Sequence, residues 1–308
     1  MSTYALPRLL YILLAIASLI CCEANGTQQH SRDQAKNKPQ LILTAGDIAD
    51  CRRLSPELTK SKKTAELIET ELARDPTGLV ITLGDNTYPS GKPSEFDDCY
   101  DKTWGRFKPR SLPSPGNHDY GVPLAHGYYN YFDELAGPSR RGYYKKVLGS
   151  WLILSLNSNI HGPAMQEQLT WLQKELLENK HPCTLAFWHH PVFSSGGHGN
   201  NEVMEEAWKL LAKAKADIVL ASHDHDYERF SPLDARGFRD DQNGIRSFVV
   251  GTGGAKLTPM FFPKFTTEVR DNDTHGVLKL LLYSNSYEWE FIPIAGQTFT
   301  DRGHGNCH

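Results

Sequence analysis

The chain has 308 residues, of which 39% are hydrophobic and 22% charged, and this supplies enough apolar side chains for a sizeable core. The length suits one α/β domain better than two small ones. The net charge of −3 at pH 7 is close to neutral, so no basic field would draw nucleic acid or an anionic membrane to the surface. Composition therefore argues against a nucleic-acid partner.

An apolar run over residues 9–22 follows Arg8 at the start of the chain. The run is too short to cross a bilayer comfortably and ends among small and polar residues, which is typical of a secretory signal peptide. We therefore expect residues 1–24 to be a signal peptide and the mature protein to be secreted or extracytoplasmic, without stable membrane association. An uncleaved anchor, or a lipid on Cys21 or Cys22, is the alternative.

Residues 25–39 are polar and rich in Lys, Gln and Asn, so we expect a loose lead-in to a catalytic domain over residues 40–308. Gln40–Ala45 is expected to be a buried strand, residues 58–74 a helix with one apolar face, and Leu79–Leu83 the next buried strand. This order of strand, helix and strand predicts a parallel pair of strands.

Residues 89–142 are rich in Gly, Pro, Tyr and Asp without clear periodicity, which predicts long loops with short helices. Beyond them, helix and strand patterns alternate and the chain ends in strands. The expected elements are a hairpin around Gly149-Ser150, a helix from about Pro163, a helix over residues 202–214, and strands over residues 185–188, 217–221, 247–250, 277–282 and 287–292.

Cys51, Cys99, Cys183 and Cys307 remain beyond the expected leader. An even number in an exported chain favours disulfides, and the close paired spacing of zinc ligands is missing. Cys51 and Cys99 each follow a loop at the end of neighbouring strands, so we predict that they pair and leave Cys183 for Cys307. Four cysteines allow three connectivities, and the other two stay open.

Five polar segments each follow an apolar run: Ala45-Gly46-Asp47, Leu83-Gly84-Asp85-Asn86-Thr87-Tyr88, Pro115-Gly116-Asn117-His118-Asp119, Phe187-Trp188-His189-His190-Pro191 and Ser222-His223-Asp224-His225. Singly, each Gly-Asp pair could be an ordinary turn, and His189 a structural histidine. Together they offer oxygen and nitrogen donors suited to two first-row transition metals at the carboxyl ends of strands. Strand periodicity would point His223 and His225 to one side.

In these segments the sequence resembles the calcineurin-like metallophosphoesterase superfamily, and within it the purple acid phosphatases. The superfamily's blocks run D-x-H, G-D, G-N-H-[DE], H and G-H-x-H, but Ala49 stands where the first His belongs. Purple acid phosphatases also lack that His and use the Tyr of G-D-x-x-Y, which is Tyr88 here. Ser222 replaces the usual Gly without removing a ligand. The resemblance covers roughly residues 41–254 and implies a four-layer αββα sandwich with the metal site at the carboxyl ends of the strands.

The resemblance also implies a binuclear centre, with one metal held by Asp47, Asp85, Tyr88 and His225 and the other by Asp85, Asn117, His189 and His223. A phenolate prefers trivalent iron, so the expected cofactors are Fe(III) and a divalent Fe, Zn or Mn ion. His118 and His198 would be the catalytic histidines, stabilising the transition state or protonating the leaving group. His190 and Asp224 are expected beside the site or in solvent, without binding metal.

The implied activity is that of an acid phosphatase-type phosphoric ester hydrolase. It would cleave small phosphate monoesters by in-line attack of a metal-bound hydroxide. A phosphodiesterase or nucleotide pyrophosphatase using the same site is the alternative, because pocket shape decides between them. A binding protein with a vestigial metal site is disfavoured by the complete ligand set. Residues 251–254, Gly-Thr-Gly-Gly, lack the Lys of a P-loop, so we expect a turn that approaches the site.

Overall fold

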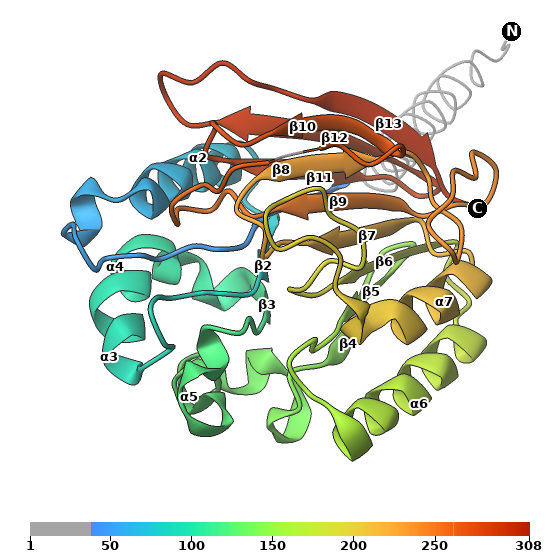
Figure 1. Ribbon diagram of the computed structural model, residues 1–308, viewed down its shortest axis with the longest axis horizontal. Helices are drawn as coiled ribbons and strands as arrows, with labels where there is room; N and C mark the ends of the chain where they lie inside the picture. Colours follow the sequence, from blue (N-terminus) through green and yellow to red (C-terminus); the bar gives the residue numbers. More distant parts are fainter. Residues whose placement is uncertain (1–37, 261) are drawn as a thin grey trace, which may run out of the picture. The chain divides into compact units, whose positions relative to one another are not determined.

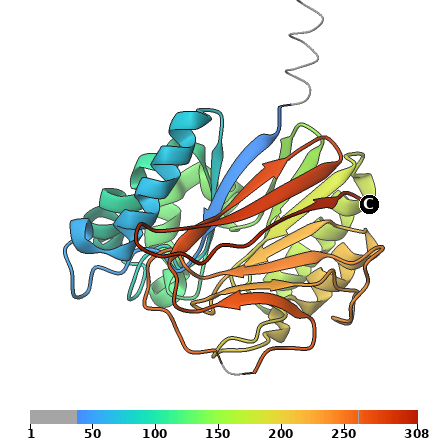
Figure 2. The same ribbon diagram turned by 90° about the horizontal axis from the view of Figure 1, so that it is seen from above.

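Two mixed β-sheets lie between two groups of helices (Figure 1 and Figure 2). The structure is a computed structural model that describes residues 38–260 and 262–308. The signal peptide predicted over residues 1–24 and most of the predicted lead-in over residues 25–39 lie outside the described residues. Among the residues described, no helix combines the length and apolar character needed to cross a bilayer.

The first sheet has the order β13 (Arg302–Asn306), β12 (Ser286–Pro293), β11 (Gly276–Leu282), β1 (Gln40–Ala45), β2 (Leu79–Leu83) and β3 (Ser111–Ser114). Strands β1, β2 and β3 run parallel, as predicted for β1 and β2, while β11 pairs with β1 antiparallel. Helix α2 (Lys60–Arg74) connects β1 to β2 and begins after Thr59, whose side chain accepts a hydrogen bond from the Lys62 amide. Its apolar face, with Ala65, Ile68 and Leu72, is buried.

The second sheet has the order β10 (Thr267–Asp271), β8 (Tyr227–Phe230), β9 (Arg246–Val250), β7 (Ile218–Ala221), β6 (Cys183–Phe187), β5 (Trp151–Ser155) and β4 (Tyr144–Leu148). Both of its faces are covered, so its central strands are apolar throughout. In β7, Ile218 and Leu220 join the core that includes the first sheet. Val219 instead joins a second core with α6 (Gly162–Glu178) and α7 (Glu205–Lys213). The four-layer αββα prediction is confirmed.

The long segment after β2 contains short helices around β3, as the Gly- and Pro-rich composition predicts. They are α3 (Pro93–Glu95), η2 (Phe96–Tyr100), α4 (Asp101–Thr103), η3 (Trp104–Arg110), η4 (Asp119–Gly121), η5 (Pro123–Ala125), α5 (His126–Phe132), η6 (Asp133–Ala136) and η7 (Pro138–Arg140). Two further short helices, η1 (Pro56–Leu58) and η8 (Glu202–Met204), precede α2 and α7. The hairpin of β4 and β5 turns at Gly149-Ser150, where it was predicted.

Both predicted disulfides are present. Cys51 pairs with Cys99, which joins the loop after β1 to η2 beyond β2. Cys183 pairs with Cys307, which joins the carboxyl-terminal strand β13 to the start of β6. The pairing follows from the parallel order of β1 and β2, because their carboxyl ends lie at the same edge of the sheet.

Candidate metal centre

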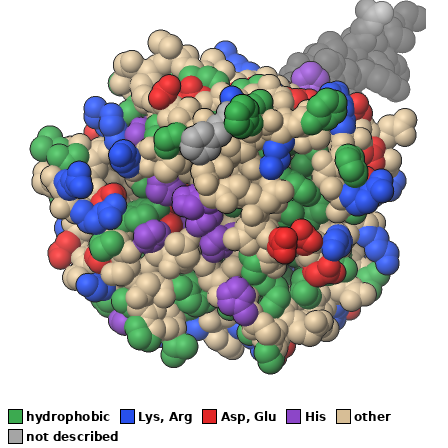
Figure 3. Space-filling model, in the orientation of Figure 1, with side chains coloured by type: hydrophobic (Ala, Val, Ile, Leu, Met, Phe, Trp, Pro, Cys, Tyr) green, Lys and Arg blue, Asp and Glu red, His purple; other side chains and the backbone are tan. Residues whose placement is uncertain are grey.

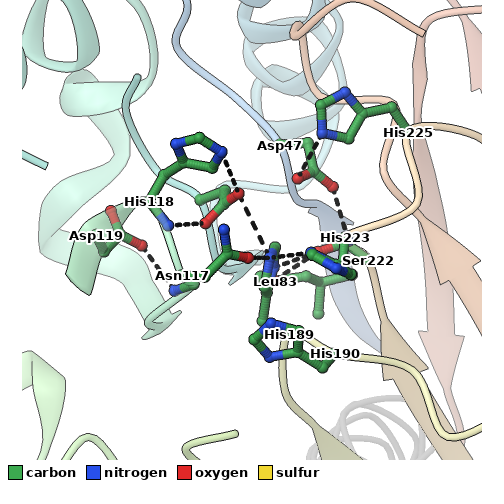
Figure 4. A network of polar contacts seen from close by, with 12 residues as sticks. Asp47, Leu83, Asn117, His118, Asp119, His189, His190, Ser222, His223 and His225 are labelled. Atoms are coloured by element: carbon green, nitrogen blue, oxygen red, sulfur yellow. Dashed lines mark hydrogen bonds and ion pairs between the residues drawn. The ribbon is translucent and has the colours of Figure 1, made fainter. Parts of the chain in front are cut away.

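The five polar segments meet at one edge of the two sheets. Five of the candidate donors lie two or three residues beyond a strand: Asp47 after β1, Asp85 after β2, Asn117 after β3, His189 after β6 and His223 after β7. Tyr88 and His225 follow a little later in the same loops as Asp85 and His223. Figure 3 shows histidine side chains gathered on this face, and Figure 4 shows how the donors converge. The structure thus brings together every site residue predicted from the sequence.

Four side chains form the first half of the cluster. The Tyr88 hydroxyl oxygen lies 2.9 Å from Asp47 Oδ1, 3.1 Å from Asp85 Oδ2 and 3.2 Å from His225 Nε2. His225 Nε2 is also 3.3 Å from Asp47 Oδ1. One hydroxyl hydrogen cannot be donated to both carboxylates at once, and a cation among these oxygen and nitrogen atoms would satisfy all of them together.

Asp85 extends the cluster to its second half. Its Oδ2 atom lies 3.4 Å from His189 Nε2, which is 3.0 Å from Asn117 Oδ1 and 3.2 Å from His223 Nδ1. The Oδ2 atom therefore faces both the Tyr88 side and the His189 side. This is the position that a bridging carboxylate would need between two metals.

Backbone carbonyls fix the orientation of two of these imidazoles. His189 Nδ1 lies 2.9 Å from the carbonyl oxygen of Leu83, and His225 Nδ1 lies 2.8 Å from that of Lys256. A carbonyl only accepts, so each Nδ1 carries the hydrogen when the ring is neutral. Each Nε2 lone pair then faces the cluster, which is the tautomer that a metal ligand requires.

Close backbone contacts bring the first two segments together. The amide of Asp47 donates a hydrogen bond to the carbonyl of Gly84. The amide of Tyr88 donates one to the carbonyl of Ala49. Asp47 and Asp85 both have left-handed backbones, with φ of 57° and 47°. Gly84 also has a positive φ, of 86°, and a Cβ there would lie 2.7 Å from His189 Nδ1. Such conformations are uncommon outside functional sites, because they cost stability.

The geometry of His223 and His225 differs from the prediction. We expected strand periodicity to place both rings on one side, but residues 222–225 form a turn between β7 and β8. His223 has a φ of 71°, and its amide donates to Asp47 Oδ2 at 3.0 Å. The rings reach the same centre because this turn wraps around the Asp47 carboxylate.

The buried charges shift the pKa values of the cluster strongly. Burial alone would lower the pKa values of His189 and His225, but the neighbouring carboxylates of Asp85 and Asp47 raise both to about 9. Burial would raise the pKa of Asp85, yet His189 holds it well below its usual range. Burial and the two carboxylates raise the pKa of Tyr88 well above its ordinary value, so a phenolate there needs added positive charge.

The predicted catalytic residue His118 lies at the opening of this cluster. Its amide donates to Asp85 Oδ1 at 2.8 Å, and its Nε2 lies 3.9 Å from Asp85 Oδ2. Its Nδ1 lies 2.6 Å from the carbonyl oxygen of Pro89, so Nδ1 carries a hydrogen and Nε2 faces the site. The side chain is 36% exposed and therefore accessible to a ligand.

His198, the other predicted catalytic residue, packs against His223 with 4.4 Å between ring centroids. Asp224 Oδ1 accepts hydrogen bonds from the His198 amide at 2.7 Å and from its Nδ1 at 3.1 Å. Asp224 is fully buried and also accepts a hydrogen bond from Ser194 Oγ. Of the two positions expected for Asp224, beside the site or in solvent, the structure shows the first: the residue is buried and orients His198.

Sequence reasoning assigned no role to Asp119, which organises the second and third segments. Its buried carboxylate accepts hydrogen bonds from the amides of Gly116 and Asn86 and from the Asn86 side chain. The acidic position of the G-N-H-[DE] block was the available signal. Ser222, noted only as a substitution, donates to the carbonyl of Leu83 at 2.6 Å.

The Gly-rich residues 251–254 form a turn that approaches the centre, as predicted. The amide of Gly253 donates to the carbonyl of Gly46, and that of Gly251 to the carbonyl of Asp226. A Cβ on Gly251 would lie 2.7 Å from Asp47 Oδ2, which explains the need for glycine. These two amides are used within the protein and are not free to bind a phosphate.

The chemistry of the donors matches two metals of unequal charge. The Tyr88 half would provide two carboxylates, a phenolate and an imidazole, whereas the His189 half adds only neutral donors to the shared Asp85. Asp47, Asp85 and His189 alone offer ligand atoms that all lie within 4.8 Å of one another. The residues present therefore fit a binuclear centre.

Comparisons with known proteins point to the same chemistry. The sequence profile described as calcineurin-like phosphoesterase matches residues 15–227. The chain is 26% identical over 247 residues to Fe(3+)-Zn(2+) purple acid phosphatase 12 of Arabidopsis thaliana, covering 68% of this chain and 52% of that protein. It is 25% identical over 294 residues to a nucleotide pyrophosphatase/phosphodiesterase of Hordeum vulgare, covering 82% of this chain and 78% of that protein.

Among solved structures, purple acid phosphatase PPD1 from yellow lupin (Lupinus luteus) seeds matches with a TM-score of 0.71 and 19% sequence identity. The match covers 87% of this chain and 54% of that chain, and it supports the fold. The chain thus spans about half the length of the Arabidopsis relative and of the lupin structure.

Proposed function

The chain belongs to the calcineurin-like phosphoesterase family, and we propose that it is a purple acid phosphatase-like enzyme that hydrolyses phosphate monoesters. One observation carries the proposal: Asp85 Oδ2 lies between a tyrosine-containing donor set and an amide- and imidazole-containing set. Two metal ions bound there would polarise the phosphoryl group and lower the pKa of a water molecule. The rest of the chemistry falls to the protein's own residues.

We propose that His118 protonates the leaving oxygen or stabilises charge on it. Its Nδ1–H is committed to the Pro89 carbonyl, so a transferable proton is carried on Nε2, the atom that faces the site. His198 would assist from the other side, where Asp224 holds its Nδ1. Backbone amides and buried side chains around these histidines keep them in place before a substrate binds.

The metals that best match the two donor sets are Fe(III) on the Tyr88 side and a divalent Fe, Zn or Mn ion on the His189 side. A phenolate with two carboxylates provides hard, anionic oxygen ligands, and these favour a trivalent ion. The second side adds only an amide oxygen and two imidazoles to the shared carboxylate, and these suit a divalent ion.

A second activity, the cleavage of phosphodiesters or nucleotide pyrophosphates, is favoured by the similarity to the barley relative, which covers most of both chains. We further propose that the protein acts outside the cytoplasm. Its two disulfides support this, because such bonds persist in oxidising compartments.

The decisive experiment is metal analysis of the purified protein together with a substrate panel. We expect two metals per chain and faster hydrolysis of p-nitrophenyl phosphate than of bis(p-nitrophenyl) phosphate or ATP. A preference for the diester or for ATP would establish the second activity. A metal-loaded protein that hydrolyses none of these substrates would refute an enzymatic role.

A further inference from the structure

His190 is a further histidine beside the metal centre, and neither the motifs nor the proposed mechanism gives it a role. Its side chain is 9% exposed, and its ring centroid lies 4.9 Å from that of His189 and 4.4 Å from that of His223. One of its ring nitrogens lies within 4.8 Å of a ring nitrogen of each of these residues. Figure 4 shows His190 next to His189 in the same cluster.

Ser158 determines which nitrogen of His190 carries the hydrogen. Ser158 Oγ accepts a hydrogen bond from the His190 amide at 3.1 Å and lies 2.8 Å from His190 Nδ1. The serine is 2% exposed, and no other acceptor in the described part of the chain lies within hydrogen-bond distance of its hydroxyl. Its hydrogen is therefore donated to His190 Nδ1, which places the ring hydrogen on Nε2.

This arrangement is opposite to that of the proposed metal ligands. The Nδ1 atoms of His189 and His225 donate to backbone carbonyls, which leaves their Nε2 lone pairs free for a metal. His190 Nε2 carries a hydrogen and cannot bind a metal without losing it. Within residues 38–260 and 262–308, no acceptor lies within hydrogen-bond distance of His190 Nε2. His190 Nε2–H is thus a donor beside the site, on a side chain that is mostly buried, and it has no partner in the described part of the chain.

We propose that His190 Nε2–H donates a hydrogen bond to a phosphoryl oxygen of the substrate, with Ser158 as the positioning residue that holds the donor tautomer. A phosphoryl oxygen is the acceptor that a substrate of this site would offer, because the nearest ring nitrogens, on His189 and His223, are proposed to hold a metal. The inference rests on the proposed function and adds a specific phosphate contact on the His189 side of the centre.

The test measures binding of inorganic phosphate by isothermal titration calorimetry, on protein whose metal content has been measured. His190→Ala should weaken phosphate binding about 10- to 100-fold with both metals retained, as expected for loss of a hydrogen bond to a charged group. His190→Gln can still donate from its side-chain amide and should lose less. His304→Ala, at an exposed histidine of β13, is the matched control and should bind phosphate like the wild type.

Variants of Ser158 provide an independent readout if His190→Ala folds poorly. Ser158→Ala removes the hydroxyl that selects the tautomer and should weaken phosphate binding, whereas Ser158→Thr keeps it and should not. Unchanged phosphate affinity in metal-replete His190→Ala, or loss of metal in that variant, would overturn the inference. Wild-type protein that retains its metals but neither binds phosphate nor hydrolyses esters would instead overturn the proposed function.

Discussion

Tyr88 distinguishes this centre from the D-x-H pattern of the superfamily, in which a histidine follows the first aspartate by two residues. Ala49 occupies that position here, and its carbonyl accepts the Tyr88 amide, so the two segments lie side by side. The Tyr88 hydroxyl enters between Asp47 and Asp85, where the alanine side chain could not reach. We therefore propose that the aromatic residue supplies the donor that the first segment lacks.

Iron-loaded protein should accordingly be violet or pink, because a phenolate bound to Fe(III) absorbs visible light by charge transfer. Tyr88→Phe should abolish this band and weaken iron retention, since it removes one anionic donor from the half of the site that carries the most negative charge. Absorption spectra and metal analysis of both proteins test this. A visible band that persists in Tyr88→Phe would show that Tyr88 is not a ligand.

His118 is expected to affect turnover without holding metal. Its imidazole is fixed by the Pro89 carbonyl and lies beside, not among, the donor atoms. His118→Ala should lower kcat by about 10²–10⁴ while metal content stays unchanged. His126→Ala, at a half-buried histidine of the same segment whose Nδ1 also lies near a backbone carbonyl, is the control and should retain activity. Wild-type turnover in metal-replete His118→Ala would exclude the role.

Asp224 should act through His198, so the effect of changing Asp224 should depend on whether the leaving group of the substrate needs a proton. Asp224→Asn keeps an acceptor for the His198 amide but removes the negative charge next to Nδ1. Turnover of alkyl phosphates, which need a proton donor, should fall about 10-fold or more, with a smaller effect on p-nitrophenyl phosphate. Equal losses on both substrates, at unchanged metal content, would indicate that Asp224 is structural only.

At the scale of elements, burial decided which parts were predictable. Strands buried on both faces, such as Leu79–Leu83, were recognised as apolar runs followed by a polar turn. Strands β8 and β10 were missed because charged residues interrupt their apolar pattern: Arg229 in β8 bonds Asp301 and also Glu268, which lies in β10. Strand β13 was missed because it alternates glycine with polar residues, and β3 because it contains Pro113.

Most of the site residues were predictable because Asp47, Asp85, His189 and His223 lie just after recognisable strands, whereas Asn117 and His118 were found from their Gly-Asn-His-Asp segment although β3 was missed. What the sequence could not supply was the geometry that orients them. The turn of residues 222–225 and the burial of Asp224 both depend on contacts with segments more than 20 residues away, such as that between the His223 amide and Asp47. Local patterns carry no information about such contacts.

The two disulfides act on different elements and should be separable by experiment. Cys51–Cys99 spans 48 residues and braces the loop after Asp47 against η2, whereas Cys183–Cys307 spans 124 residues and ties β13 to β6. Removing either by paired Cys→Ala substitution should lower the free energy of unfolding by about 2–4 kcal/mol.

Metal retention should separate the two disulfide variants. Loss of Cys51–Cys99 frees the segment that follows Asp47 and should also speed metal loss to a chelator. Loss of Cys183–Cys307 should not, because that bond lies at the start of β6, at the opposite end of the strand from His189. Urea unfolding and the rate of metal release measure the two effects. Equal release rates in both variants would contradict the assignment.

At the scale of the whole molecule, the protein has little net charge but concentrates buried charges at one edge of its sheets. Without metal, the buried carboxylates of Asp47 and Asp85 are balanced by protons on His225 and His189. With metal, the same imidazoles must give up those protons, so protons and metals compete for the centre. Stability and metal binding are therefore linked through pH.

The metal-free protein should lose stability as pH rises from about 6.5 to about 9. The pKa values of His189 and His225 are raised to about 9 in the folded protein, above the value of about 6.5 for unfolded histidine. Their contribution is therefore complete below pH 6.5 and disappears as pH rises through 9. Metal-loaded protein should not show this loss, because its imidazoles are already deprotonated, and the difference in Tm between the two forms should widen over the same interval.

Thermal unfolding of chelator-treated and metal-loaded protein at pH 6, 7.5 and 9 tests this, with metal-free His225→Gln as the control expected to show a flatter profile. A Tm of the metal-free protein that stays constant or rises between pH 6.5 and 9 would contradict the account of buried charge at this centre.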